Sequence, residues 1–297
     1  MAKKMLFIFN PRSGKGAIKN NLLDIVDIFV KGGYDVTVRP TQKRGDLSEQ
    51  IAEKGTEFDV ITVCGGDGTI HEAAGAMLKL PEDRRPRIGY IPAGSTNDFA
   101  ANLGIPNDMK TAAKLVSEGS QSPCDLGMFN GKPFVYVAAA GILADVSYDT
   151  PQDIKNVLGH SAYVIEVIRR LSEMKTFRVK LKGEGFEREK DCLLFLLLNS
   201  SQVGGFNVDN FVRSDISDGV FEAVMIERFA NLIEAEQALS AIFSGQQSGP
   251  GFEVIRSDRF EIETDEGIRW TLDGEFGGEH SRIKFSVLPK AINIIGA

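Results

Sequence analysis

Cysteine, histidine and tryptophan are scarce in this 297-residue sequence, which has three cysteines, three histidines and one tryptophan. The cysteines lie far apart, form no CxxC pair and are odd in number, which argues against a disulfide framework. We therefore expect reduced, buried thiols in a cytoplasmic protein at Cys64, Cys124 and Cys192. The histidines are isolated, so the sequence predicts no histidine metal cluster.

Long hydrophobic runs are missing as well. The longest, residues 192–198, is far shorter than the roughly 20 residues that span a bilayer. Residues 5–9 are too few for the apolar core of a secretion signal. We expect a soluble, cytoplasmic protein whose contact with a membrane is peripheral, on its inner surface.

An excess of positive charge is the third absence. The chain has 34 Lys+Arg against 41 Asp+Glu, a net charge of −7, which argues against a nucleic-acid binder. Basic side chains still cluster at residues 43–44, 84–87 and 169–170. Each such charge near an anionic bilayer is worth about 1 kcal/mol, so these clusters are candidates for a peripheral membrane contact.

Strand and helix signals alternate through the first 120 residues, and hydrophobic residues make up an ordinary 42% of the chain. We predict short buried strands at residues 5–9, 34–38, 60–63 and 88–91, with helices at 18–30, 47–54 and 69–80. This alternation is typical of an α/β domain with a mostly parallel sheet and helices on both faces. We assign residues 1–125 to this domain, with residues 289–297 as a strand that could complete it.

The second half is richer in strand signals. Asn130-Gly131 predicts a tight hairpin, and further short strands follow at residues 177–181, 192–199, 220–226, 259–262, 269–272 and 283–287. Two helices are expected, at residues 154–174 and 231–243. The pattern predicts a β-sandwich-like domain with helical insertions over residues 126–288, whose paired sheets could support a homodimer.

The segment Gly65-Gly66-Asp67-Gly68-Thr69 follows the third predicted strand. Glycines let backbone N–H groups approach phosphate oxygens, and the helix that Thr69 opens attracts anions at its N-terminus. A carboxylate at Asp67 would repel phosphate unless a cation such as Mg²⁺ lay between them. The alternative is an ordinary glycine-rich turn in which Asp67 caps the helix.

Two further segments also follow strands, so all three should meet at one edge of the sheet. Asn10-Pro11-Arg12-Ser13-Gly14 lacks the GxxxxGK[ST] spacing of a Walker A loop, but its polar and glycine residues suit a phosphate. Residues 92–100, PAGSTNDFA, form a turn and a capped helix start, whose hydroxyls serve equally as caps or ligands.

Together and in this order, the three segments resemble the diacylglycerol kinase catalytic family of lipid kinases, whose signature is NPxSG, GGDGT and PxGTxNDFA. Asp218-Gly219 and Asp273-Gly274-Glu275 extend the similarity over essentially the whole chain. GGDGT also occurs in NAD kinases and phosphofructokinases, so the third segment and the late DGE make the resemblance specific. Two residues depart from it: Ser95 stands where the family usually has Thr, and Ala101 where it commonly has Arg.

The resemblance implies an ATP- and Mg²⁺-dependent kinase that phosphorylates a lipid hydroxyl, such as that of diacylglycerol, at a membrane surface. It implies that the second domain holds the lipid and that ATP contacts a set of residues in the first: Asn10, Pro11, Arg12, Ser13, Gly14, Thr41, Gly66, Asp67, Gly68, Thr69, Ile70, His71, Glu72 and Ser95. Thr41 alternatively caps the next helix.

Asp273 and Glu275 are similar to the catalytic pair of the family, with Asp67 handling the cation of the nucleotide. A carboxylate must accept the proton of the lipid alcohol. We favour Asp273, with Glu275 either sharing that role or orienting the base, although Asp-Gly is also a common turn dipeptide.

A structural Mg²⁺ loop is the last implied feature. The resemblance places its ligands at the side chain of Asp218 and the carbonyl oxygens of Asp215 and Val220, oxygen donors of the kind that hard cations prefer. An exposed acidic turn is the alternative.

Two other functions remain open. A kinase of a soluble acceptor such as NAD would share the GGDGT segment. A non-catalytic nucleotide- or lipid-binding regulator would not need Asp67, Asp273 and Glu275.

Overall fold

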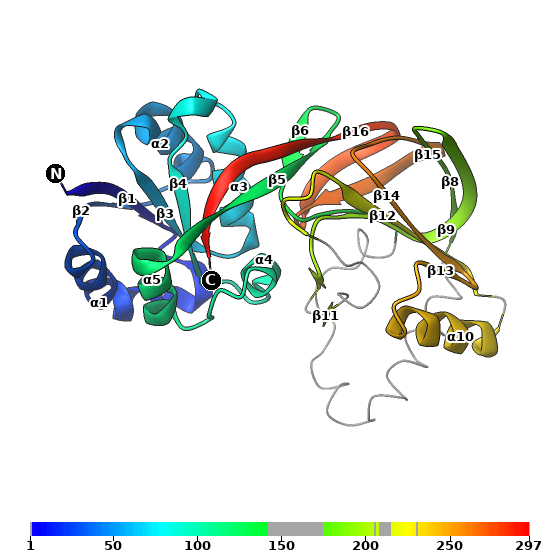
Figure 1. The fold of residues 1–297 in the computed structure, drawn as a ribbon, viewed down its shortest axis with the longest axis horizontal. Helices are drawn as coiled ribbons and strands as arrows, with labels where there is room; N and C mark the ends of the chain where they lie inside the picture. Colours follow the sequence, from blue (N-terminus) through cyan, green and yellow to red (C-terminus); the bar gives the residue numbers. More distant parts are fainter. Residues whose placement is uncertain (1, 142–174, 205, 208–214, 230, 297) are drawn as a thin grey trace.

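The computed structural model describes residues 2–141, 175–204, 206–207, 215–229 and 231–296. The chain has a mixed helix and strand fold with a β-rich second half, as predicted (Figure 1). The expected helix at residues 154–174 and the basic pair at 169–170 lie outside the described residues. Within the described ranges, no helix combines the length and apolar character needed to cross a membrane.

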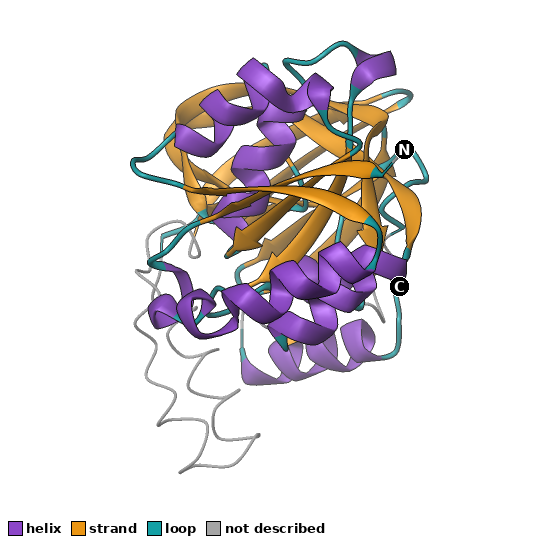
Figure 2. Cartoon of the chain, turned by 90° about the vertical axis from the view of Figure 1, so that its left-hand side faces the viewer, coloured by secondary structure: helices purple, strands orange, loops and turns teal. Residues whose placement is uncertain are grey.

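The first half alternates strands and helices. Its elements in chain order are β1 (Lys3–Phe9), η1 (Ser13–Gly16), α1 (Ile18–Lys31), β2 (Tyr34–Pro40), α2 (Asp46–Lys54), η2 (Gly55–Glu57), β3 (Val60–Gly65), α3 (Asp67–Met77), η3 (Glu82–Arg84), β4 (Arg87–Pro92), α4 (Asp98–Asn102) and α5 (Met109–Glu118). β1 pairs in parallel with β2 and β3, and β3 pairs in parallel with β4. Helices cover both faces, with α1 against α5 on one and α2 against α3 on the other (Figure 2).

Burial explains why these short apolar segments become strands. All six residues of β3 are buried, as expected for a strand covered by helices on both faces. The buried residues of α1 and α5 recur at helical spacing, which gives each helix one face toward the sheet. The polar loops after β1, β3 and β4 are thereby left at one edge.

The second half is built mainly from antiparallel strands. They are β5 (Ser120–Phe129), β6 (Lys132–Phe134), β7 (Val137–Gly141), β8 (Phe177–Gly183), β9 (Phe186–Leu198), β10 (Gln202–Val203), β11 (Phe206–Asn207), β12 (Phe221–Glu227), β13 (Ser248–Gly249), β14 (Phe252–Ser257), β15 (Arg259–Leu272) and β16 (Glu275–Gly296), with α10 (Leu232–Phe243). β7 and β8 each pair with both β9 and β15, so these four strands close into a ring. Aromatic side chains fill its core, including Trp270 with its ring centroid 4.9 Å from that of Phe129.

Two long strands, β5 and β16, run through both halves (Figure 1). β16 pairs with β15 in the second half, and its Ile294 pairs in parallel with Ile88 of β4 in the first. The expected domain boundary between residues 125 and 126 therefore lies inside a continuous strand, β5. The Asn130-Gly131 hairpin is present, with both residues at positive φ, 47° and 82°.

All three cysteines are free and buried, as predicted. Burial raises the pKa of the Cys64 and Cys192 thiols to about 12 and also raises that of Cys124. These thiols are packing residues of the core.

Candidate active site

The loops that follow β1, β3 and β4 pack against one another through glycines. A Cβ on Gly14 would collide with the carbonyl oxygen of Ala93, and a Cβ on Gly94 would lie 2.6 Å from the Cα of Gly66. Only glycine permits such close backbone approach. The three motifs, distant in sequence, therefore form one surface.

A cleft of about 820 Å³ opens beside these loops. Nine of the residues predicted to bind the nucleotide line it: Asn10, Pro11, Arg12, Thr41, Gly66, Gly68, Thr69, His71 and Glu72. Five others do not line it: Ser13, Gly14, Asp67, Ile70 and Ser95. Among these, Ile70 is buried in the core and Ser95 is exposed on the loop after β4.

The N-terminus of α3 faces the cleft. Gly66 precedes the helix in an extended conformation, and no side chain caps this end. The first helical amides and the helix dipole together favour an anion here. This is the anion-binding arrangement expected from GGDGT.

Asp67 lies at the first position of α3 and is not among the residues that line the cleft. Its Oδ1 accepts a hydrogen bond from the backbone N–H of Phe99 at 3.3 Å. Burial raises the pKa of Asp67, and the neighbouring carboxylates of Asp98 and Asp273 raise it further, against the lowering effect of the bond from Phe99. A divalent cation would relieve this repulsion, so the surroundings of Asp67 fit the cation of a nucleotide.

Several cleft residues escaped the sequence prediction. Lys43, Arg44 and Lys79 line the cleft and add positive charge around it. The sequence offered a signal for the first two, since they lie two and three residues after Thr41. Lys79 lies near the end of α3 and bonds the hydroxyl of Ser48 at 3.0 Å, a contact that nothing local in the sequence indicates.

Glu72 lines the cleft but also supports α2. Its Oε1 accepts a hydrogen bond from the backbone N–H of Ser48, in the first turn of that helix, at 2.9 Å. The side chain therefore ties α3 to α2 on this wall.

Asp273 occupies the turn between β15 and β16 at a φ of +50°, and Gly274 follows at +83°. Asp273 therefore forms the Asp-Gly turn, and this does not exclude the catalytic role that the resemblance implies for it. This conformation directs the carboxylate inward, and the side chain has no exposed surface. Both oxygens accept hydrogen bonds, from three consecutive backbone N–H groups at 135–137 and from the ring of His71.

Glu275, the second member of the pair, reaches the cleft. Its carboxylate is half-exposed and forms an ion pair with Arg44 at 3.1 Å. The contact links the loop after β2 with the start of β16, across the two halves of the chain. A Cβ on Gly68 would lie 3.2 Å from Glu275 Oε1, so the carboxylate also sits close to the N-terminus of α3.

His71 joins the first half to Asp273. Its Nδ1 lies 2.6 Å from Asp273 Oδ2, and the two residues are 202 positions apart in sequence. Burial lowers the pKa of His71, but the hydrogen bond and charge of Asp273, helped by Glu275 and Glu72, outweigh it and raise the pKa above the ordinary histidine value.

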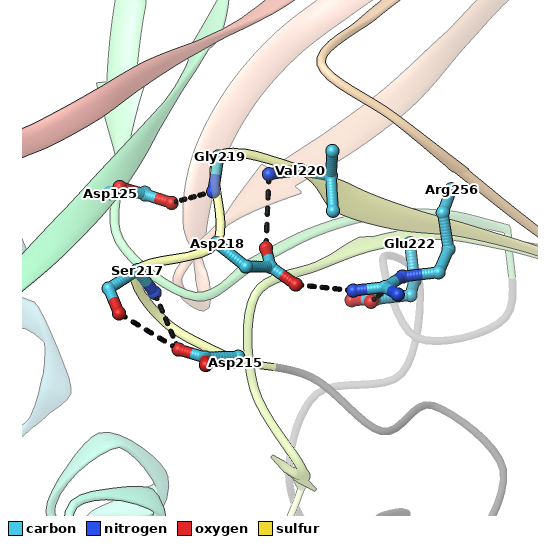
Figure 3. A network of polar contacts seen from close by, with 8 residues as sticks. All are labelled: Asp125, Asp215, Ser217, Asp218, Gly219, Val220, Glu222 and Arg256. Carbon is cyan, nitrogen blue, oxygen red and sulfur yellow. Dashed lines mark hydrogen bonds and ion pairs between the residues drawn. The ribbon is translucent and has the colours of Figure 1, made fainter.

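The acidic loop predicted to hold a metal is closed by bonds within the protein (Figure 3). Asp218 forms an ion pair with Arg256 and accepts a hydrogen bond from the backbone N–H of Val220 at 3.1 Å. Asp215 accepts bonds from the backbone N–H and hydroxyl of Ser217, both at 3.0 Å. Arg256 supplies a counter-charge to Asp218 in this arrangement, and the metal site at this loop stays a prediction. No grouping of three or more metal-ligating side chains occurs among the described residues.

The chain matches two family models. The diacylglycerol kinase catalytic domain matches residues 4–129. The YegS C-terminal NAD kinase beta sandwich-like domain matches residues 136–296.

Curated relatives match most of the chain. A diacylglycerol kinase of Bacillus subtilis (strain 168) is 33% identical over 279 residues, which is 93% of this chain and 91% of the relative. A diacylglycerol kinase of Staphylococcus aureus (strain JH9) is 32% identical over 282 residues, 94% of this chain and 88% of the relative.

Solved structures share the fold. A protein of Bacillus anthracis, described as a candidate diacylglycerol kinase, superimposes with a TM-score of 0.83 at 26% identity, over 100% of this chain and 96% of that one. A diacylglycerol kinase structure from the same organism superimposes with a TM-score of 0.77 at 23% identity, over 100% and 97% of the two chains, and supports the fold alone.

Proposed function

Because the chain belongs to the diacylglycerol kinase family and is a kinase, we propose that it transfers the γ-phosphate of ATP to the hydroxyl of a membrane lipid. Diacylglycerol, which would give phosphatidic acid, is the acceptor we favour. The observation that carries the proposal is that one cleft is lined both by the loops after β1 and β3 and by Glu275.

The nucleotide side of the cleft is the first half. The open N-terminus of α3 and the glycines before it suit the phosphates of ATP, and the positive side chains of Arg12, Lys43 and Lys79 line the same space. A divalent cation, which we propose is Mg²⁺, would be held near Asp67 and neutralise phosphate charge during the transfer. Phosphoryl transfer depends mainly on such positioning and charge stabilisation.

The acceptor side is the second half. Pro133 and the 65%-exposed Phe276 add apolar surface to the rim beside Glu275. A lipid alcohol has a small polar head on a large apolar body, so it needs carboxylates and apolar contacts close together. We assign the acceptor hydroxyl to the space next to Glu275 and the His71–Asp273 pair.

The acceptor class is tested with radiolabelled ATP and two kinds of acceptor. We expect label in phosphatidic acid when vesicles contain diacylglycerol, and little label in NADP when NAD is supplied. The second candidate, a soluble-acceptor kinase, is favoured by the match of residues 136–296 to an NAD kinase-like domain. Rapid formation of NADP without lipid phosphorylation would establish that candidate instead.

A further inference from the structure

We propose that His71 accepts the proton of the acceptor hydroxyl and that Asp273 is the positioning residue that holds His71 in place. The proposal rests on the proposed kinase function and assigns the proton transfer within it. It departs from the expectation that Asp273 itself meets the hydroxyl.

The surroundings of Asp273 leave no room for a substrate hydroxyl. The side chain is fully buried. Oδ1 accepts hydrogen bonds from the N–H groups of Tyr136 and Val137, at 2.9 and 3.1 Å. Oδ2 accepts from the N–H of Val135 at 2.7 Å and from His71 at 2.6 Å. A carboxylate has about four accepting positions, and the protein fills all of them.

The ring of His71 extends from this buried carboxylate to the cleft. A carboxylate only accepts hydrogen bonds, so Nδ1 of His71 carries the proton and donates it to Asp273. In the neutral ring Nε2 is then the accepting nitrogen. The side chain is 25% exposed and lines the cleft, and Nε2 has no hydrogen-bond partner among the described residues. Asp273 thus selects the tautomer whose free lone pair is available to a ligand.

The position of His71 on α3 places it next to the reacting phosphate. It lies four residues after Asp67, and residues so spaced share one face of a helix. The proposed phosphate site is the N-terminus of the same helix. An acceptor hydroxyl beside the γ-phosphate would therefore lie near the ring.

Glu275 is the competing base. Its carboxylate is paired with Arg44 and sits half-exposed at the rim of the cleft. Its charge raises the pKa of His71, which strengthens the histidine as a base. Glu275 therefore assists the proton transfer through its charge.

The proposed step balances in atoms and electrons. The O–H bond of the acceptor breaks, and its proton moves to Nε2 of His71. The hydroxyl oxygen forms a bond to the γ-phosphorus, while the bond from that phosphorus to the bridging oxygen breaks and leaves its electron pair on ADP. The carboxylate of Asp273 stabilises the imidazolium, which then releases its proton to water.

The decisive variant is His71→Asn, because the Asn amide can still donate a hydrogen bond to Asp273 but cannot accept a proton. We expect kcat for the lipid acceptor to fall by about 10²–10⁴-fold, which is the rate enhancement that a general base usually provides. The KM for ATP should change far less than kcat, and the melting temperature should stay near that of the wild type. Added imidazole should restore part of the activity of His71→Ala.

The pH profile separates a chemical role from a structural one. The groups that face His71 are Asp273, Glu275 and Glu72. A base works when deprotonated, so wild-type kcat should rise with pH through the raised pKa of His71. Asp273→Asn removes the main charge that raises this pKa, so the rise should move to lower pH.

Two results would overturn the proposal. One is wild-type kcat in His71→Asn from a preparation whose wild type phosphorylates the lipid. The other is an unchanged acid limb in His71→Asn and no imidazole rescue of a folded His71→Ala. A wild type that phosphorylates no lipid would instead contradict the proposed function, and the assay of the wild type alone tells the two failures apart.

Discussion

Gly94 shows how much of the site depends on the absence of one side chain. A Cβ at this position would lie 2.6 Å from the Cα of Gly66 and 2.7 Å from Oδ1 of Asn97. The backbone at Gly66 could make room for this Cβ only if the loops after β3 and β4 moved apart. The glycine is needed for close approach, since its φ is not positive.

Gly94→Ala should therefore lower both stability and ATP affinity. We expect a loss of about 1–3 kcal/mol of unfolding free energy, typical of overpacking, measured by urea denaturation. Gly267→Ala is the control, because nothing lies within 4 Å of its Cβ position. Equal unfolding midpoints for the two variants would contradict the packing described here.

Single residues also mark the limit of what the sequence could predict. The DGE pattern identified Asp273 and Glu275, but their environments differ sharply: one is buried and fully bonded, the other half-exposed. The pairing of His71 with Asp273 crosses 202 positions and depends on how the two halves meet. No local pattern contains that information.

Among the elements, α3 is held at both ends. Its N-terminus faces the cleft, and its C-terminus is tied down by Arg85, which lies in one of the basic clusters considered for membrane contact. The Arg85 guanidinium donates to the carbonyl oxygens of Met77 and Leu80, at 3.1 and 3.3 Å, and to that of Ala291 in β16 at 2.8 Å. Arg85 is thus a structural link and not a free surface charge.

Arg85→Ala should destabilise the protein by about 1–3 kcal/mol, because three carbonyl groups lose a charged donor. Arg84→Ala is the matched control, since Arg84 is exposed and lies next to it in the chain. Thermal melting of both variants checks the expectation. If Arg84→Ala lowered the melting temperature as much as Arg85→Ala, the hydrogen bonds that link Arg85 to β16 would not stabilise the protein.

Helices and strands with a strong apolar periodicity could be predicted from the sequence. Those whose apolar pattern is made of small side chains or is interrupted could not. The helix α5 was missed, although Met109, Ala112, Ala113 and Val116 are buried at helical spacing and Asp108 caps its start, because alanines weaken the pattern. β14 was also missed, despite alternate burial at Phe252 and Val254. The two strands expected at residues 283–287 and 289–297 are one strand, β16, with an irregularity between Leu288 and Ile292.

At the scale of the whole molecule, β5 and β16 make the two halves one mechanical unit. Each strand contributes to both hydrophobic cores, so two continuous strands join the halves. Disruption of one core should therefore be felt in the other.

Ile294→Ala tests this coupling. Ile294 is buried in the first half, while Trp270, the single tryptophan, is buried in the core of the second. Removing the side chain should cost about 2–5 kcal/mol and lower the unfolding midpoint seen by tryptophan fluorescence. Ile233→Ala, at a 67%-exposed position, should leave that midpoint unchanged. A fluorescence midpoint equal to that of the wild type, alongside an earlier loss of circular dichroism, would mean that the halves unfold separately.

The most direct test of the central claim is transfer of label from γ-³²P ATP to diacylglycerol in vesicles, measured with the wild type, Asp67→Asn and Asp83→Asn. Asp83 is exposed and is not among the residues that line the cleft, so its variant controls for the loss of one charge. The account predicts labelled phosphatidic acid from the wild type and Asp83→Asn, and a loss of at least about 10²-fold in Asp67→Asn, which lacks the carboxylate proposed to hold the cation. Unlabelled lipid with the wild type, or equal labelling by all three proteins, would contradict it.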